Sequence, residues 1–171
     1  TDRIVLRNFE ADDLNDLYEY CSQDDVGEMA GWMKHTSVSY SRRVLNHYIK
    51  NRNLFALVYK ENNKVIGHIG INEDSEGERA DIKELGYVLN KEYWNKGLMA
   101  EAVRAVLAEL FERWTGIEYV YACCFQHNPA SKKLIEKCGF KFDKEGTVEA
   151  KILNKTFCCY EYLYTKEMWE S

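Results

Sequence analysis

Hydrophobic residues follow two different spacings along the chain, and each spacing predicts one kind of element. Residues 3–9 alternate between apolar and polar positions, which is typical of a strand. Residues 11–22 and 41–51 carry apolar residues three and four positions apart, the spacing of one face of a helix. Residues 24–41 show no clean period, so we expect an irregular loop, and a loop of this length is often functional. The apolar face of the first helix is expected to consist of Leu14, Leu17, Tyr18 and Cys21.

The middle of the chain favours strands. Residues 54–71 give two apolar strands around the polar turn at 61–64, which is a hairpin signal. A polar surface loop at 72–80 then leads into a strand at 81–90. Gly86 in the middle of that strand indicates a bulge or a close approach of the backbone.

The strongest helical pattern begins at Gly97, and Gly116 is expected to end that helix. Its apolar stripe consists of Val103, Val106, Leu107, Leu110, Phe111 and Trp114. A near-continuous apolar strand at 118–126 follows, of the kind that is buried on both faces. The next helix has readable ends, with Asn128 as N-cap, Pro129 at the first helical position and Gly139 as its stop. Residues 141–169 read as strands with a hairpin at 153–155.

This order of elements predicts an α/β (α+β) fold. Antiparallel hairpins surround one strand–helix–strand crossover, so we expect a mixed, mostly antiparallel, twisted sheet of about six to seven strands with about four helices. The chain has 171 residues, of which 46% are hydrophobic, enough for one well-buried core and few for two. We therefore expect a single domain over residues 1–171.

Composition and charge exclude several classes of protein. The net charge of -5 comes from 28 acidic and 23 basic residues that are interspersed, which argues against a nucleic-acid partner and suits an amine-bearing substrate. The sequence shows no long apolar run, signal peptide or tail motif, so we expect a cytoplasmic protein without a membrane partner. The six cysteines lack CxxC spacing, so we expect them to be buried apolar side chains rather than metal ligands.

Gly97 stands where a helix begins, and this position is suited to anion binding. The first N–H groups of a helix have no partner inside the helix, and a glycine lets an anion approach the backbone closely. The sequence contains neither GxGxxG nor GxxxxGK[ST], so a dinucleotide loop and an ATP phosphate loop are not supported. The alternative is an ordinary helix start with a glycine used for packing.

Three stretches together resemble the GCN5-related N-acetyltransferase (GNAT) family. They are "ELGYVLNKEYWNKGLMAEAV", "VYACCF" and "NPASKKLIEKCGF", and they look like its branch of Rim-type ribosomal-protein N-terminal acetyltransferases. The order of elements is similar from Arg3 to about Trp169, nearly the whole chain. This resemblance implies acetyl-CoA as co-substrate, no metal, and two central strands that splay apart.

The resemblance also implies which residues bind coenzyme A. In the family, a loop of pattern Q/R-x-x-G-x-G/A wraps the pyrophosphate with backbone amides. Trp94 stands here for the Gln or Arg and Met99 for the second small residue, and main-chain donors make these changes tolerable. The corresponding residues are Trp94, Asn95, Lys96, Gly97, Leu98, Met99 and Ala100.

Other residues are expected to hold the pantetheine arm. By resemblance, the backbone of Tyr87, Val88 and Leu89 pairs with it as an added strand, and a free N–H there polarises the thioester carbonyl. Asn128 touches the arm and the Ser131 hydroxyl lies near the sulfur, although both also suit a plain helix start.

Catalysis needs a base and a route for the departing thiolate. Glu84 resembles the family's Glu in "E-I-G-Y" and would remove the amine proton through water, unless it is only a solvated or ion-paired strand residue. In many relatives a Tyr at the position of Ile135 is the acid that protonates the departing thiolate. Here the proton would come from Ser131 or a bound water, or the thiolate would leave without one.

The irregular loop at 24–41 is where the family places acceptor-binding residues. Glu28, Trp32 and His35 are the candidates there, and each also suits a surface or core position. His47, His68 and His127 have no spacing that indicates a triad or a metal site.

These features predict an N-acetyltransferase in which a primary amine attacks acetyl-CoA directly in a ternary complex. No activated cysteine supports a covalent acetyl-enzyme. The acceptor is expected to be a protein N-terminal α-amine or a small amine, namely a polyamine, an aminoglycoside or an amino acid. A catalytically silent acyl-CoA-binding module and a plain interaction domain are the alternatives, and the protein is expected to be a monomer or homodimer.

Overall fold

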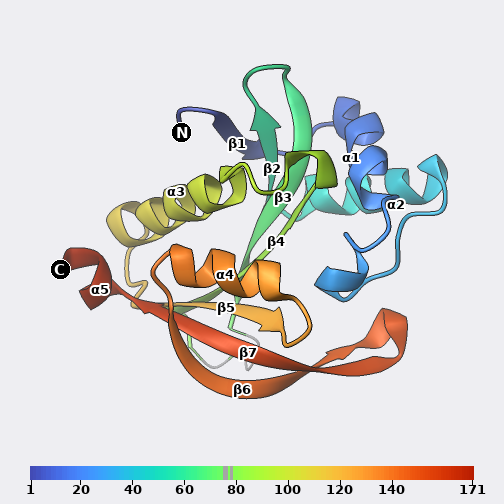
Figure 1. The fold of residues 1–171 in the computed structure, drawn as a ribbon. Coiled ribbons are helices and arrows are strands. Elements are labelled where there is room, and N and C mark those ends of the chain that lie inside the picture. Colours follow the sequence, from blue (N-terminus) through green and yellow to red (C-terminus); the bar gives the residue numbers. More distant parts are fainter. Residues whose placement is uncertain (75–76, 78) are drawn as a thin grey trace. The chain divides into compact units, whose positions relative to one another are not determined.

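Seven strands form a sheet in the order β1-β2-β3-β4-β5-β7-β6 (Figure 1). β4 and β5 pair in parallel, as the α3 crossover between them requires, and β1–β2, β2–β3, β5–β7 and β6–β7 pair antiparallel. The strands are β1 (Ile4–Asn8), β2 (Leu54–Tyr59), β3 (Lys64–Glu73), β4 (Ile82–Leu89), β5 (Tyr119–Phe125), β6 (Lys141–Ala150) and β7 (Lys155–Thr165). The mixed, mostly antiparallel sheet predicted from the sequence is confirmed.

The computed structural model describes residues 1–74, 77 and 79–171. Ser75, Glu76 and Glu78, which belong to the polar loop expected at 72–80, lie outside the described residues. The helices are α1 (Leu14–Cys21), α2 (Val38–Lys50), α3 (Leu98–Arg113), α4 (Pro129–Lys137) and α5 (Lys166–Glu170), with 3-10 turns η1 (Ala11–Asp13), η2 (Glu28–Ala30), η3 (Lys91–Tyr93) and η4 (Lys151–Leu153).

Two compact units make up the chain. The first comprises Thr1–Gly70 and Tyr87–Ala102, and the second comprises Ile71–Gly86 and Val103–Ser171. The chain passes from one unit to the other within β3, β4 and α3.

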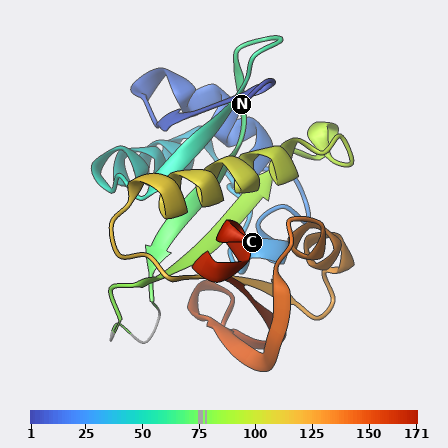
Figure 2. The same cartoon turned by 90° about the vertical axis from the view of Figure 1, so that its left-hand side faces the viewer.

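The first unit holds α1 and α2, which lie next to one another in both views (Figures 1 and 2). Of the face predicted for α1, Tyr18 is only half-buried, and Tyr20 is buried in its place. α2 starts three residues before the predicted start at 41, because the Ser37 hydroxyl accepts the Tyr40 N–H at 3.1 Å and caps the helix. One buried cluster of this unit consists of Phe9, Leu14, Leu17, Tyr20, Cys21, Val26, Leu45, Ala56, Val58, Val65 and Val88.

A close backbone approach occurs in the first unit at Gly67 rather than at Gly86. A Cβ at Gly67 would lie 2.3 Å from the carbonyl oxygen of Val88, which no side chain can occupy. A Cβ at Gly86 would meet only the Asn72 Nδ2 atom at 3.9 Å. The glycine that the sheet requires is therefore on β3.

The second unit contains the long β6–β7 hairpin and α4. β4 and β5 pair from Ile82–Tyr119 to Leu85–Ala122. β5 buries Val120, Ala122 and Cys124 on one face and exposes Cys123, so the prediction of a strand buried on both faces is wrong.

Two helix ends in this unit differ from the predictions. α3 ends at Arg113, so Trp114 lies outside it and is 40% exposed rather than part of the apolar stripe. The segment predicted as strand up to residue 169 ends at Thr165, whose hydroxyl accepts the Met168 N–H at 3.3 Å and caps α5.

Two further properties bear on the protein's surroundings. None of the described helices is long and apolar enough to cross a membrane. All six cysteines are free thiols, and four are buried as predicted, whereas Cys123 and Cys158 are exposed.

Candidate active site

The loop between η3 and α3 contains two residues with left-handed backbone. Asn95 and Gly97 have φ angles of 60° and 76°, the left-handed region that glycine and asparagine adopt most readily. Successive N–H groups in such a turn form a concavity suited to an anion. The loop therefore has left-handed backbone at two of the positions predicted to bind coenzyme A.

The first turn of α3 adds main-chain donors. Leu98, Met99 and Ala100 are only 1%, 3% and 3% exposed, so their side chains belong to the core. The Glu101 N–H donates to the Gly97 carbonyl at 3.1 Å, and this bond opens the helix. An anion at this helix start would meet backbone N–H groups and the positive end of the helix dipole.

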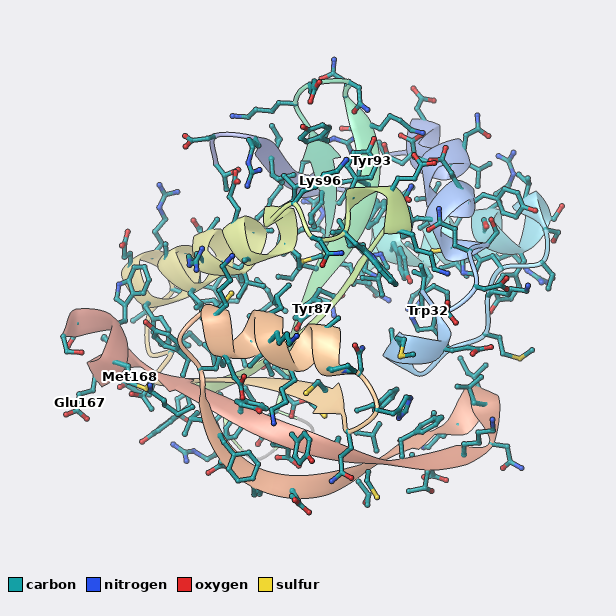
Figure 3. All side chains as sticks on the ribbon, in the orientation of Figure 1. Trp32, Tyr87, Tyr93, Lys96, Glu167 and Met168 are labelled. Carbon is teal, nitrogen blue, oxygen red and sulfur yellow. The ribbon has the colours of Figure 1, made fainter. Side chains whose placement is uncertain are left out.

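Trp94 fastens the loop to the end of β4. Its indole N–H donates to the Leu89 carbonyl at 2.7 Å, which brings together two residues predicted for the site. The Lys91 Nζ atom lies 5.9 Å from the Trp94 ring centroid, and the Lys96 Nζ atom lies 5.0 Å from the Tyr93 ring centroid (Figure 3). Cations therefore stand over the aromatic rings on both sides of the turn.

Arg3, which the sequence analysis did not single out, also reaches this loop. Its Nε and Nη2 atoms both lie 2.7 Å from the Glu101 carboxylate, and its Nη1 atom donates to the Lys96 carbonyl at 3.0 Å. Partial burial acts to raise the pKa of Glu101, but hydrogen bonds from Thr1 and Arg3 outweigh it and lower that pKa to about 2. No local spacing relates residue 3 to residue 101, so sequence reasoning missed this contact.

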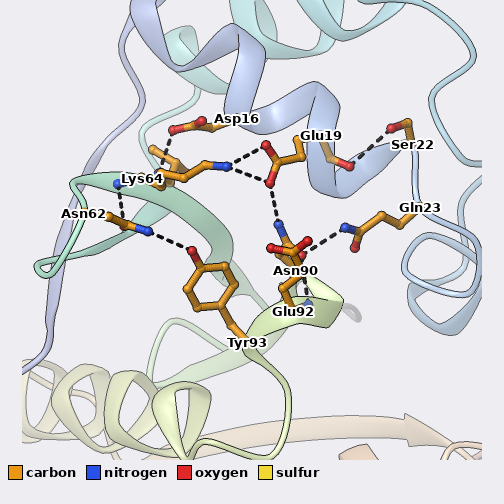
Figure 4. A network of polar contacts seen from close by, with 10 residues as sticks. Asp16, Glu19, Ser22, Gln23, Asn62, Lys64, Asn90, Glu92 and Tyr93 are labelled. Carbon is orange, nitrogen blue, oxygen red and sulfur yellow. Dashed lines mark hydrogen bonds and ion pairs between the residues drawn. The ribbon is translucent and has the colours of Figure 1, made fainter.

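A buried polar network fixes the end of β4 just before the loop (Figure 4). Asn90 is 1% exposed, and its amide donates to Glu19 at 3.1 Å and accepts from Gln23 at 3.0 Å. Its oxygen also accepts the Glu92 N–H at 3.1 Å, which caps η3. Lys64 pairs with Glu19 at 2.6 Å. The network thus joins α1, β3 and η3 within the first unit.

The residues predicted to pair with pantetheine form the end of β4. Val88 is buried, whereas Tyr87 and Leu89 are half-buried and, by the alternation of a strand, share the opposite face. The Asn90 N–H donates to the Ile66 carbonyl at 2.7 Å, which ties this end of the strand to β3.

The predicted acceptor residues differ in their surroundings. Glu28 is exposed on η2, and the half-buried Trp32 places its ring against Gly27, where a Cβ would lie 2.5 Å from the ring. His35 is buried, its Nδ1 lies 2.7 Å from the Ser41 hydroxyl, and burial lowers its pKa to about 4. His35 is therefore a neutral, inward-facing residue rather than a surface one.

His68, to which the sequence analysis gave no role, is a second buried histidine in the first unit. The Tyr20 hydroxyl lies 2.9 Å from its Nδ1 atom. Burial, together with the charge of His35, lowers the pKa of His68 to about 3. The imidazole is thus a neutral hydrogen-bonding member of the core.

Glu84 belongs to the second unit and is half-buried on β4. Tyr121 of β5 is its Cα partner in the parallel ladder, so the two side chains lie on the same face of the sheet. The neighbouring Lys83 points to the opposite face, is buried and forms an ion pair with Glu73.

Asn128 and Ser131 lie together at the start of α4, also in the second unit. The Asn128 side chain accepts the Ser131 N–H at 3.2 Å, so the predicted N-cap is confirmed. Ile135, at the position where many relatives carry a tyrosine, is 1% exposed and contributes to the core. Within the part of the chain that the structure describes, no three His, Cys, Asp or Glu side chains are grouped so as to hold a metal ion.

Comparison with known proteins agrees with this architecture. The family model of the acetyltransferase (GNAT) domain matches residues 3–141, most of the chain. An uncharacterized N-acetyltransferase of Bacillus licheniformis, p20, is 31% identical over 152 residues, which cover 85% of this chain and 82% of the relative.

Solved structures share the fold. A GNAT-family acetyltransferase from Bacillus anthracis matches with a TM-score of 0.83 at 25% identity, covering 96% of each chain. The microcin C7 self-immunity acetyltransferase MccE, solved in complex with acetyl-CoA and AMP, matches with a TM-score of 0.80 at 19% identity and covers 96% of this chain and 93% of its own. The chain therefore belongs to the GNAT family of acetyl-CoA-dependent N-acetyltransferases.

Proposed function

We propose that residues 1–171 act as one catalytic domain that transfers the acetyl group of acetyl-CoA to a protein N-terminal α-amine. The observation that carries the donor half of this proposal is the loop with left-handed Asn95 and Gly97 ahead of α3. Its main-chain N–H groups suit the coenzyme A pyrophosphate, because the adjoining side chains of Leu98, Met99 and Ala100 are buried. The resemblance to Rim-type enzymes supports an α-amine as acceptor.

The remaining donor contacts follow the family pattern. The backbone of Tyr87, Val88 and Leu89 pairs with the pantetheine arm, and Asn128 and Ser131 lie near its sulfur end. The acetyl-CoA complex of the fold neighbour MccE supports acetyl-CoA as the bound donor. Asn128 can cap α4 and still use its amide N–H₂ on the ligand, because only its oxygen accepts the Ser131 N–H.

Glu84 is the proposed general base, acting through water. A lysine amine has a pKa near ~10.4 and an α-amine near ~8, so either acceptor is largely protonated at neutral pH and must lose a proton. His35 is a poor candidate because it is buried and its pKa is about 4. Glu28 and Trp32 then serve the acceptor side, Glu28 as an exposed carboxylate and Trp32 as an apolar wall.

No tyrosine stands at position 135 to protonate the departing thiolate. Ile135 is apolar and buried, so it has no proton to give. The proton comes from Ser131 or a bound water, or the thiolate leaves without one.

An assay of thiol release with a panel of amines tests the function. Acetyl-CoA is the donor, and the panel contains peptides with free N-termini, the same peptides with acetylated N-termini, spermidine, an aminoglycoside and single amino acids. Thiol release with the free peptides alone supports the proposal. Thiol release only with the small amines would show that the acceptor is a small amine and not a protein N-terminus. Binding of acetyl-CoA without turnover on any amine would identify a silent acyl-CoA-binding module instead.

A further inference from the structure

Arg3 precedes β1, yet its side chain ends at the loop before α3. Its guanidinium makes contacts in two directions, to the Glu101 carboxylate at 2.7 Å and to the Lys96 carbonyl at 3.0 Å. The Arg3 main-chain N–H also donates to Glu101, at 2.9 Å. The first turn of α3 and the loop ahead of it are therefore fastened to the same residue.

The contact with the Lys96 carbonyl sets the direction of the neighbouring N–H. The peptide bond between Lys96 and Gly97 is trans, so the Lys96 carbonyl and the Gly97 N–H share one plane and point in opposite directions. Holding the carbonyl toward Arg3 turns the Gly97 N–H away from Arg3. The Arg3 Nη2 atom lies 3.7 Å from the place of a Cβ on Gly97, so the guanidinium is on the side of Gly97 that a side chain would occupy.

The contact with Glu101 removes an electrostatic conflict. A carboxylate in the first turn of a helix suits the helix dipole but repels an anion bound at the same helix start. The Nε and Nη2 atoms of Arg3 both lie 2.7 Å from one carboxylate oxygen, Oε2, and the Arg3 main-chain N–H donates to the other oxygen, Oε1. The anion site thereby keeps its positive character although an acidic residue stands beside it.

We infer that Arg3 is a positioning residue for the acetyl-CoA diphosphate: it acts through its contacts with two neighbours, orienting the Lys96–Gly97 peptide and neutralising Glu101. This inference rests on the proposed donor site at Gly97. A planar guanidinium fits the role because it can donate to a carboxylate and to a carbonyl at once, which a lysine ammonium on one flexible stem does less well.

Kinetics with two acetyl donors distinguish an effect of Arg3 on the diphosphate from a general effect on the structure. Acetyl-CoA carries the diphosphate, whereas S-acetylpantetheine offers the same thioester without it. Steady-state kinetics with both donors would be measured for the parent protein, Arg3→Gln, Arg3→Lys and the control Arg113→Gln. Arg113 forms an exposed pair with Glu109 at 3.3 Å on the same helix, so its replacement also removes an ion pair of α3.

Arg3→Gln is expected to raise the KM for acetyl-CoA roughly tenfold, the scale of a lost charge-assisted hydrogen bond, with little change in kcat. Arg3→Lys should give an intermediate KM. With S-acetylpantetheine, both variants should match the parent, and Arg113→Gln should match it with either donor.

Several results would overturn the inference. The first is an unchanged KM for acetyl-CoA in Arg3→Gln. The second is an equal rise in KM with acetyl-CoA and with S-acetylpantetheine, and the third is a parental KM for acetyl-CoA in Arg3→Lys. If Arg3→Gln does not fold, Arg3→Lys decides the matter by the same comparison of donors. Failure of the parent protein to bind acetyl-CoA at all would instead remove the proposed donor site, and this inference with it.

Discussion

The indole N–H of Trp94 donates to the Leu89 carbonyl at 2.7 Å, so the residue that opens the loop is bonded to the last residue of β4. The bond closes a turn of backbone around η3 and places the left-handed Asn95 immediately after it.

Trp94→Phe should loosen this turn while keeping an aromatic ring. Loss of one hydrogen bond is expected to lower the free energy of unfolding by about 0.5–1.5 kcal/mol and to weaken acetyl-CoA binding. Urea unfolding and titration calorimetry measure the two effects. Trp114→Phe is a matched control, because Trp114 is exposed to 40% and Trp94 to 39%. Equal acetyl-CoA affinity in the parent and Trp94→Phe would contradict a role for this bond.

Gly97→Val should weaken acetyl-CoA binding far more than it weakens the fold. A branched side chain resists a φ of 76° and stands beside the N–H groups that the anion needs. Gly116→Val is the control, since Gly116 has a φ of 83° and nothing within 4 Å of a Cβ. Both variants should lose about 1–2 kcal/mol of stability, and only Gly97→Val should lose affinity. Retention of parental affinity by a folded Gly97→Val protein would show that the anion loop lies elsewhere.

Acetyl-CoA should stabilise the protein against heat. A ligand at ~100 times its dissociation constant adds about 2.7 kcal/mol to the free energy of unfolding. Thermal melting with and without millimolar acetyl-CoA measures this, and the Gly97→Val protein should show a smaller rise in Tm. If acetyl-CoA leaves the Tm of the parent protein unchanged, the proposed acetyl-CoA site is wrong.

Glu84→Gln should lower turnover by roughly ~10²–10⁴-fold, the contribution of a general base, without changing acetyl-CoA affinity. Raising the pH deprotonates the amine in solution, so the variant should recover part of its deficit as the pH approaches the pKa of the acceptor. Rate profiles of both proteins from about pH 6 to 10 measure this recovery. Parental turnover across the whole range would assign the base elsewhere, with the exposed Glu28 as the next candidate.

The two buried histidines should make stability fall with acid. His35 and His68 have pKa values of about 4 and about 3 in the folded protein, below the ordinary 6.5 of an unfolded chain. Below pH 6.5 the unfolded state therefore binds more protons, so stability is present in full above pH 6.5 and is lost as the pH falls toward 4. Each histidine contributes a slope of up to about 1.4 kcal/mol per pH unit.

Urea unfolding between pH 7.5 and 5 checks this slope. His68→Asn should flatten it whatever its effect on absolute stability. His47→Gln, at an exposed position of α2, should leave the slope as it is. Parallel slopes for all three proteins would contradict the assignment of His68 as a neutral core residue.

Local signals predicted most of the fold. Asn128, Pro129 and Gly139 marked the ends of α4 because capping and backbone preferences act over a few residues. The errors lie where a polar side chain decides an end, as at the Ser37 and Thr165 caps, or where a partner strand decides exposure, as at Cys123. Such contacts are not visible in periodicity.

The candidate site also contains residues that local sequence indicates and residues that it does not. Gly97 could be singled out from the sequence because it stands directly before the strongest helical pattern. Arg3, Asn90 and His68 could not, because each acts through residues distant in sequence: Arg3 through Glu101, Asn90 through Glu19, and His68 through Tyr20. The identity of a buried polar residue's partner is fixed only when the chain is folded.

The buried side chains at the start of α3 have an evolutionary consequence. A site built from main-chain N–H groups constrains backbone angles and leaves the neighbouring side chains to serve the core. Positions such as Met99 can therefore drift among apolar residues without loss of the ligand. The proposed donor site requires left-handed backbone at Asn95 and Gly97, so its trace in the sequence is a pair of residues, two positions apart, that tolerate a positive φ.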